Sequence, residues 1–352
     1  MSVEFRNVVK RYGQATAVAG VSFTVDEGTL VTLLGPSGCG KTTTLRMIAG
    51  LELPSEGRIL IAGRDVTTLG ATERDVSMVF QSYALFPHMS VLENVSYGLR
   101  RSGRAKGQAQ KQALEGLAQV GLEEYGARQP SELSGGQQQR VAVARALVLE
   151  PSVLLFDEPL SNLDARLRRQ MREEIRELQR RLGLTVVYVT HDQQEAMAVS
   201  DRIIVMNAGR IEQQGTPRDL YERPATPFLA RFMGESNPAR GHVRRLDARR
   251  VRVTLGPSSF EIDNGVAREG KATVAVRPEA ITVETAPGPA GSLPGTLAKA
   301  SYLGTHMEYS IETEAGTLFA TCPKVERPLE AGDKVALVLA PRGVIVVEDQ
   351  AA

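Results

Sequence analysis

Residues 35–42 could hold a chain of phosphates. Their letters, GPSGCGKT, fit the pattern G-x-x-x-x-G-K-[ST] and stand between a short apolar run and a helical pattern. Glycines let backbone N–H groups turn toward phosphate oxygens, and the start of a helix adds positive potential. Lys41 would then reach the β- and γ-phosphates, and the Thr42 hydroxyl would bind Mg²⁺. The candidate nucleotide contacts of this segment are Gly35, Pro36, Ser37, Gly38, Cys39, Gly40, Lys41, Thr42 and Thr43.

A pair of adjacent carboxylates, Asp157 and Glu158, follows the apolar run of residues 153–156. Side chains alternate along a strand, so the two carboxylates point in different directions and suit two separate tasks. Asp157 could hold Mg²⁺, and Glu158 could orient and polarise an attacking water molecule. Such a pair is usually only the end of a strand, but together with the phosphate loop it indicates a catalytic site.

His191 follows another apolar run, residues 185–189. A lone histidine is more often a cap or a surface group than a catalyst. Sheets of the α/β class, however, place ligand-binding groups at the carboxyl ends of their strands. Its position therefore favours a functional role by a modest margin.

The segment LSGGQ contains two glycines where a helix is expected to begin. Ser134 and Gln137 form a Ser-x-x-Gln capping box, which accounts for the start of the helix. It does not account for Gly135 and Gly136, because glycine weakens the first turn. We interpret the two glycines as a place where another group must approach the backbone closely.

The elements that would position these residues are those of an α/β domain. Helical patterns alternate with short apolar runs, which are typical of strands buried on both faces. Residues 163–182 carry apolar side chains at steps of three and four, as in an amphipathic helix. Residues 90–150 lack strand signals and predict a mostly helical insertion. The expected strands are residues 30–34, 77–80, 153–156, 185–189 and 202–206.

The sequence changes character after about residue 235. Short apolar runs divided by Gly and Pro predict a small all-β barrel or sandwich over residues 236–352. The expected organisation is thus a domain of residues 1–235, with a helical subdomain at about 90–150, followed by the β-domain. A length of 352 residues fits two domains.

Composition narrows the class of protein. The 42 basic and 41 acidic residues give a net charge of +1, so nothing favours a nucleic-acid partner. Two distant cysteines make a disulfide framework improbable, and we expect Cys39 to fill space in its loop. The first residues lack a signal-peptide pattern, and no apolar stretch is long enough to span a membrane. Work at a membrane would require a partner protein.

The order of these motifs resembles that of the ABC (ATP-binding cassette) ATPases. GPSGCGKTT is similar to their Walker A motif, VLLFDE to their Walker B motif, and LSGGQ to their signature motif. Gln81 resembles the Q-loop glutamine, Asp164 lies in a segment similar to the D-loop, and His191 resembles the switch histidine. Tyr12 resembles the aromatic residue on which adenine stacks. The resemblance covers residues 1 to about 235 and implies a P-loop NTPase fold that hydrolyses ATP with Mg²⁺.

The resemblance also implies that two cassettes meet head to tail, either as a homodimer of this chain or as a pair of this chain with a second cassette. Each ATP would be held by Lys41 and Asp157 of one subunit and by Ser134 and Gly136 of the other. The resemblance assigns Gln81, Glu158 and His191 to catalysis, Thr42, Gln81 and Asp157 to the metal, and Tyr12, Ser134, Gly135, Gly136, Gln137 and Asp164 to the nucleotide beyond the phosphate loop.

Residues 191–237 resemble one group of importers supplied by a solute-binding protein. ATPases of that group carry an OB-like TOBE domain at the C-terminus, and Arg277-Pro278-Glu279 is similar to its recurring turn. The short tail favours the ferric iron or polyamine branch. A sugar or maltodextrin importer is the main alternative, and a soluble ATPase outside transport is a more distant one.

The resemblance implies two integral-membrane permease subunits, a periplasmic or lipoprotein solute-binding protein, and a peripheral place on the cytoplasmic face of the inner membrane. In this family, the segment after the Q-loop glutamine contacts the permease. Residues 83–87 and Met89 could form an exposed docking patch, or they could pack into the core of the helical subdomain. The sequence leaves both possibilities open.

Overall fold

The computed structural model describes residues 2–263 and 269–347. It divides into two compact units, Met1–Pro217 and Arg218–Ala352, here called the N-terminal and C-terminal units. The domain boundary expected from the sequence, between residues 235 and 236, falls within the second unit and stays a prediction. Within the described ranges, no helix is long and apolar enough to cross a membrane.

A six-stranded sheet forms the centre of the N-terminal unit. Its order is β10-β9-β3-β8-β7-β6, and neighbouring strands are parallel except for β10, which runs antiparallel to β9. Every residue of β3, β7 and β8 is buried, as expected for strands covered on both faces. The strands are β3 (Leu30–Leu34), β6 (Val76–Val79), β7 (Val153–Asp157), β8 (Val186–Thr190), β9 (Arg202–Asn207) and β10 (Arg210–Gly215). The predicted α/β class is confirmed.

Alternate residues of the central strands face two different layers. Val187 and Val189 of β8 share a core with α1 (Lys41–Ala49), whereas Val186 and Tyr188 share a core with α5 (Ala165–Leu182). This period of two follows from the strand geometry. It places α1, which begins at the end of the phosphate loop, on one face of the sheet and α5 on the other.

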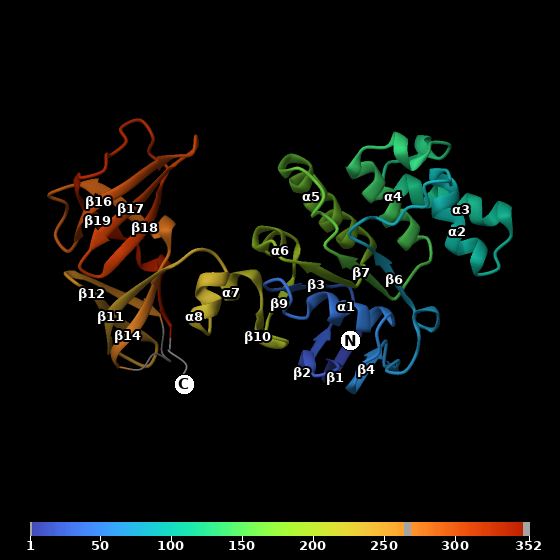
Figure 1. Ribbon diagram of the computed structural model, residues 1–352, viewed down its shortest axis with the longest axis horizontal. Coiled ribbons are helices and arrows are strands. Elements are labelled where there is room, and N and C mark those ends of the chain that lie inside the picture. Colours follow the sequence, from blue (N-terminus) through green and yellow to red (C-terminus); the bar gives the residue numbers. More distant parts are fainter. Residues whose placement is uncertain (1, 264–268, 348–352) are drawn as a thin grey trace. The chain divides into compact units, whose positions relative to one another are not determined.

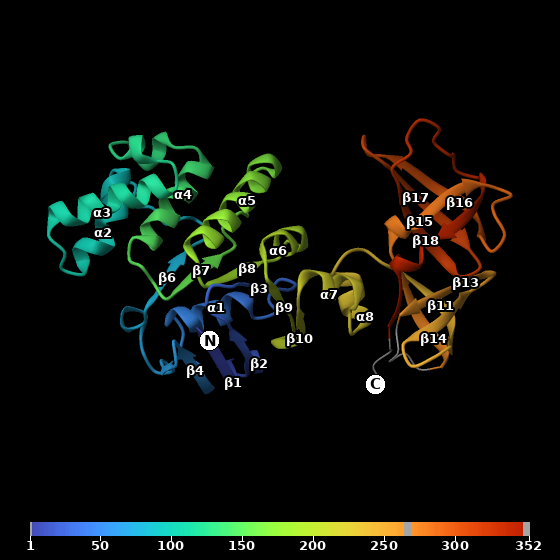
Figure 2. The same ribbon diagram turned by 180° about the vertical axis from the view of Figure 1, so that it is seen from behind.

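A second, four-stranded antiparallel sheet packs on the other side of α1. Its order is β2-β1-β4-β5, and Phe5 and Phe23 stack in its core at a centroid distance of 4.5 Å. In both views α1 lies between the two sheets (Figures 1 and 2). The strands are β1 (Val3–Tyr12), β2 (Ala15–Val25), β4 (Glu56–Ile61) and β5 (Arg64–Asp65).

Helices α2 (Val91–Arg101), α3 (Lys106–Gln119) and α4 (Gly135–Leu147) form the helical insertion next to the edge strand β6 (Figure 1). Their core is apolar and includes Val95, Leu117 and Val141, all fully buried. The short helix α6 (Gln193–Val199) follows β8. A helical segment between strands was predicted for this part of the chain, and three helices are found there.

Helices α7 (Pro217–Glu222) and α8 (Pro227–Phe232) lie at the start of the C-terminal unit, and its remaining described elements are strands and two short 3-10 helices, Pro278–Ala280 and Pro341–Gly343. Two antiparallel sheets, β13-β12-β11-β14-β20 and β15-β19-β16-β17-β18, share one apolar core. This agrees with the predicted all-β, OB-like domain. The strands are β11 (Asn237–Arg245), β12 (Arg250–Leu255), β13 (Ser258–Asp263), β14 (Gly270–Val276), β15 (Ile281–Thr285), β16 (Leu293–Tyr302), β17 (Met307–Thr313), β18 (Gly316–Cys322), β19 (Lys334–Leu339) and β20 (Val344–Val347).

A buried arginine fastens α7 and α8 to the sheets. Arg277 is 1% exposed, and its guanidinium donates to the carbonyls of Tyr221, Ala230 and Gly234 at 2.9, 2.8 and 2.7 Å. It also lies 4.2 Å from the centre of the Tyr221 ring. The planar fork of an arginine suits several acceptors at once. The turn Arg277-Pro278-Glu279 is thus a structural anchor as well as a turn.

We expect Arg277→Met to lower the free energy of unfolding of the C-terminal unit by about 3 kcal/mol, because one buried and two partly buried carbonyls lose their donor. Scanning calorimetry should show the transition of that unit moving down while the transition of the N-terminal unit stays in place. Arg342→Met is the control, since the Arg342 side chain is 84% exposed and its ion pair with Glu222 should contribute less than about 1 kcal/mol. Equal shifts for the two variants would contradict the anchor.

Candidate nucleotide site

The backbone of the phosphate loop packs closely against strand β9 at its first glycine, Gly35. A Cβ atom added at Gly35 would lie 2.2 Å from the carbonyl oxygen of Met206, and Gly40 has φ +105°. The first position therefore excludes any side chain, and the second favours glycine for conformational reasons. Helix α1 starts directly after Gly40, so its unpaired N–H groups and its dipole point into the loop.

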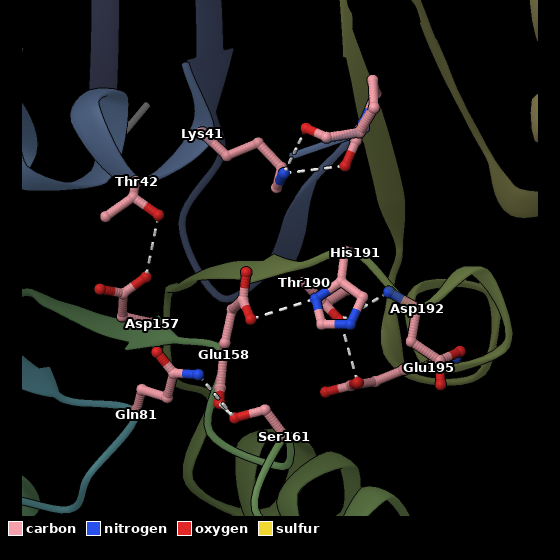
Figure 3. Close-up of polar contacts among 12 residues, drawn as sticks. Lys41, Thr42, Gln81, Asp157, Glu158, Ser161, Thr190, His191, Asp192 and Glu195 are labelled. Carbon is pink, nitrogen blue, oxygen red and sulfur yellow. Dashed lines mark hydrogen bonds and ion pairs between the residues drawn. The ribbon is translucent and has the colours of Figure 1, made fainter. Parts of the chain in front are cut away.

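Lys41 folds back over this loop. Its Nζ donates to the carbonyl oxygens of Gly35 and Pro36 at 2.8 and 2.9 Å, and the residue is 5% exposed (Figure 3). Both acceptors are neutral groups, so the positive charge remains available to an anion. A buried ammonium without a compensating charge is costly, and a phosphate bound in the loop would relieve that cost.

A hydroxyl and a carboxylate meet beside the loop. The Thr42 hydroxyl donates to Oδ1 of Asp157 at 3.4 Å. Burial raises the pKa of Asp157, and the positive charge of Arg46 opposes that rise. Mg²⁺ takes oxygen ligands and typically uses one or two carboxylates together with substrate phosphates. Within the described part of the chain, no group of three or more His, Cys, Asp or Glu could hold a metal ion.

Glu158 and His191 face each other at the ends of β7 and β8. Nδ1 of His191 lies 3.1 Å from Oε2 of Glu158 (Figure 3). Glu158 has φ +46°, a left-handed conformation that costs a residue other than glycine about 1–3 kcal/mol. Its N–H donates to the carbonyl of Val189 at 3.0 Å, which helps to hold this conformation. In this conformation the Glu158 carboxylate contacts the histidine.

Gln81 belongs to the same edge of the sheet. Its Nε2 donates to the Ser161 hydroxyl at 3.1 Å, and that hydroxyl donates to the carbonyl of Glu158 at 3.0 Å. Asn162 donates to the Gln81 carbonyl at 3.0 Å. Figure 3 shows Gln81 beside Asp157 and Glu158. The side chain of Gln81 is exposed, so its amide oxygen is accessible to a ligand in the site.

The signature segment keeps its polar contacts within the first turn of α4. The N–H of Ser134 donates to Oε1 of Gln137 at 2.9 Å, and the N–H of Gln137 donates to the Ser134 hydroxyl at 3.4 Å. A Cβ atom added at Gly135 would lie 3.1 Å from the Leu163 side chain, which precedes α5. One added at Gly136 would lie 3.0 Å from the Leu167 side chain, in α5. Close packing is therefore a second reason for the two glycines, beside the approach of another group that the sequence suggested.

Three further candidate residues lie in distinct surroundings. Tyr12 is 47% exposed, with Nζ of Lys10 4.8 Å above its ring. Asp164 caps α5 by accepting from the N–H of Leu167 at 2.9 Å. Cys39 is 3% exposed, and burial raises the pKa of its thiol, which disfavours the reactive thiolate. These surroundings give Asp164 a capping role and Cys39 a packing role, in addition to any contact with nucleotide.

Comparison with known proteins identifies the family to which the chain belongs. The ABC transporter family matches residues 18–161, and the TOBE domain matches residues 274–347. Among curated proteins, the chain is 60% identical over 346 residues to the Fe(3+) ions import ATP-binding protein FbpC 1 of Rhizobium meliloti (strain 1021), covering 98% of each chain. It is 47% identical to FbpC of Escherichia coli O157:H7, covering 99% of this chain and 98% of that one.

The chain is an ATP-binding protein of the ABC transporter family.

Solved structures agree with this assignment for the cassette. The ATP-binding cassette MJ0796, in a dimeric post-hydrolysis state bound to ADP and Pi, is 35% identical with a TM-score of 0.54. It covers 61% of this chain and 98% of that chain. CbiO1 of Clostridium perfringens, part of the ABC transporter complex cbiONQ, is 30% identical with a TM-score of 0.58, covering 62% and 89%.

Within the cassette, the segment after Gln81 is partly core and partly surface. Tyr83 is 5% exposed in the core shared with α4 and α5, whereas Ala84 and Pro87 are exposed. Tyr83 and Ala84 have φ +60° and +48°, and Arg145 donates to both of their carbonyls at 2.8 and 2.7 Å. Part of the segment thus packs in a core and part is exposed, and docking of a permease on the exposed residues stays a prediction.

Sequence reasoning did not identify the residues that hold this segment. Asn94 is fully buried in α2 and exchanges hydrogen bonds with both the N–H and the carbonyl of Phe86, at 2.8 and 3.1 Å. Arg145 of α4 holds the preceding turn. A polar residue on the apolar face of a predicted helix was the available signal for Asn94, since buried amides are normally hydrogen-bonded.

Gly35→Ala should destabilise the cassette by about 1–3 kcal/mol and abolish measurable nucleotide binding, because the new methyl group meets backbone rather than a movable side chain. Binding of a fluorescent ATP analogue and thermal melting would measure the two effects. Gly63→Ala is the control: its φ of +79° makes alanine strained, but a Cβ there meets nothing within 4 Å. That variant should bind the analogue normally. Normal binding by Gly35→Ala would show that the loop tolerates a side chain.

Proposed function

We propose that this protein binds and hydrolyses ATP with Mg²⁺ and thereby powers the import of ferric iron through a membrane permease. One observation carries the enzymatic part of this proposal. The side chains that phosphate binding, metal binding and water activation require all gather where the parallel strands β3, β7 and β8 end (Figure 3). The arrangement matches the requirements of phosphoryl transfer, which depends chiefly on positioning and on charge stabilisation.

Each residue of the site has a task that follows from its surroundings. Lys41 exchanges its carbonyl acceptors for the β- and γ-phosphate oxygens of ATP, and the N–H groups at the start of α1 bind the same phosphates. Thr42, Asp157 and Gln81 would hold Mg²⁺. The metal, when bound, neutralises charge on the phosphates.

Glu158 orients the attacking water molecule and polarises it toward the γ-phosphate. His191 holds one oxygen of that carboxylate, so the other oxygen stays directed toward the water. Tyr12, exposed at the end of β1, offers its ring to the adenine base.

The signature segment would act on ATP bound to a second copy of the chain. Ser134, Gly135, Gly136 and Gln137 open helix α4 and present a helix N-terminus, the kind of group that binds phosphate. A twofold dimer would form two equivalent sites, each with the phosphate loop of one subunit and the signature segment of the other. The dimeric state described for the MJ0796 cassette supports this arrangement.

The proposed solute comes from the relatives. Proteins named Fe(3+) ions import ATP-binding protein match almost the whole chain at 47–60% identity, including the C-terminal unit. The ATPase would work with two permease subunits and a solute-binding protein, at the cytoplasmic face of the membrane. Polyamine and sugar import are the alternatives that the experiment must separate.

Glu158→Gln should lower the rate of ATP hydrolysis at least about 100-fold, because the amide cannot act on the water as the carboxylate does. Affinity for ATP should persist, and size-exclusion chromatography with ATP should show a dimer. Glu115→Gln, on the exposed face of α3, is the matched control and should hydrolyse ATP normally. Hydrolysis at the wild-type rate in Glu158→Gln would remove Glu158 from its proposed role.

Cells that lack this chain should lose uptake of radiolabelled ferric iron and should regain it with the wild-type gene but not with Glu158→Gln. Uptake of putrescine and of maltose, measured in the same cells, should not change. Loss of putrescine or maltose uptake with iron uptake intact would contradict ferric iron as the solute while leaving the ATPase intact.

A further inference from the structure

A buried carboxylate lies directly behind the candidate catalytic histidine. Glu195, in α6, is only 4% exposed. One of its oxygens accepts a hydrogen bond from the hydroxyl of Tyr188. The other accepts from the hydroxyl of Thr190 at 2.9 Å (Figure 3). Two hydroxyl donors, one on each oxygen, form the pattern expected for an ionised carboxylate.

The hydrogen bonds continue into the loop that carries His191. The Thr190 hydroxyl also accepts from the N–H of Asp192 at 3.0 Å, and Oδ1 of Asp192 accepts from the N–H of Glu195 at 2.9 Å. Both neighbours of His191 in the chain are therefore tied to Glu195. The His191 side chain itself is 57% exposed, so its position depends on its backbone and on its contact with Glu158.

This arrangement is costly for the fold. Burial raises the pKa of Glu195, and the hydrogen bonds from Tyr188 and Thr190 oppose that rise. Burial also raises the pKa of Tyr188, which is fully buried. Asp192 alone caps α6, so the helix does not need a buried acid for its start. An expensive buried polar group beside a candidate active site points to function.

We propose that Glu195 is a positioning residue that holds His191 in contact with Glu158, acting through Thr190 and Asp192, while Tyr188 holds the other oxygen of the Glu195 carboxylate. This proposal rests on the hydrolytic roles proposed above for Glu158 and His191. Glu195 would touch neither ATP nor water. Its contribution would be geometric, because small displacements of a catalytic group reduce rates strongly.

Three substitutions disrupt the network. Tyr188→Phe and Thr190→Val each remove one hydroxyl donor, and Glu195→Gln replaces the carboxylate that accepts from both. We expect each to lower kcat for ATP hydrolysis about 10- to 100-fold. KM for ATP should stay within about twofold, because the phosphate loop is unchanged. Thr190→Ser, the matched control for Thr190→Val, keeps the bridging hydroxyl, so its kcat should be near the wild-type value.

The pH profile separates positioning from a general loss of structure. As pH falls, Glu195 takes up a proton and can no longer accept from both hydroxyls, so kcat falls. The Tyr188 hydrogen bond lowers the pKa of Glu195, so Tyr188→Phe should move the acidic limb of kcat to higher pH. Glutamine does not take up this proton, so the acidic limb of the kcat profile in Glu195→Gln should lack the contribution of the Glu195 carboxylate. The other charged or titratable groups beside the network include Asp192, Arg168, Arg172, His191 and Glu158, and all of them stay in place in these variants.

Gln179→Met is the control for stability. Gln179 is 2% exposed in α5 and donates to the carbonyls of Gly28 and Leu184 at 2.8 and 2.9 Å. Its loss should lower the melting temperature and leave kcat and the pH profile unchanged. If the network variants behave like Gln179→Met, with only a lower melting temperature, Glu195 has no positioning role.

Failure of the underlying function gives a different result. If the wild-type protein does not hydrolyse ATP, or if Glu158→Gln hydrolyses it at the wild-type rate, the proposed catalytic roles fail together with this proposal. If the wild type is active and Glu158→Gln is not, normal kcat and pH profiles in Tyr188→Phe and Thr190→Val overturn the role of Glu195 alone. Thr190→Val keeps the test valid even if Glu195→Gln does not fold.

Discussion

The parallel pairing of β3, β8 and β7 is the constraint on which the site depends. Leu34 of β3 is opposite Thr190 of β8, and Val189 of β8 is opposite Asp157 of β7. Both faces of these strands are buried, so a shift of one residue would exchange the side chains that face α1 with those that face α5. The packing of two helical layers therefore fixes the register. The register in turn brings three short loops, distant in the sequence, to one edge of the sheet.

Contacts among its own polar groups hold the site at that edge together. Lys41 bonds to carbonyls of its own loop, Thr42 bonds to Asp157, and His191 contacts Glu158. These contacts pair the polar groups of the site with one another. The left-handed conformation of Glu158 stores strain that the surrounding strands sustain. A second layer, Glu195 with Tyr188 and Thr190, supports the histidine from inside the core.

Much of this was predictable because fully buried strands leave a strong signal. The run at residues 153–156 is apolar throughout and the run at 30–34 is apolar except for Thr32, and each is followed by the polar residues that an active site needs. The antiparallel sheet of β1, β2, β4 and β5 was not predicted. Its strands are half exposed and carry charges such as Arg6, Lys10 and Arg58, so their sequence shows neither a clean alternation nor an apolar run. Irregularities in the pairing of β1 with β2 weaken the pattern further.

The sequence by itself determined which residues could bind phosphate, metal and water, since glycine, lysine and carboxylate at these spacings have few other uses in such a context. It also determined the order of the motifs and the all-β character of the tail. Only the tertiary structure decided which groups meet. The contact of Glu158 with His191, the link from Gln81 to Ser161 and the anchor at Arg277 join residues far apart in the chain. Such contacts depend on strand order and side-chain packing in three dimensions, which local sequence patterns do not specify.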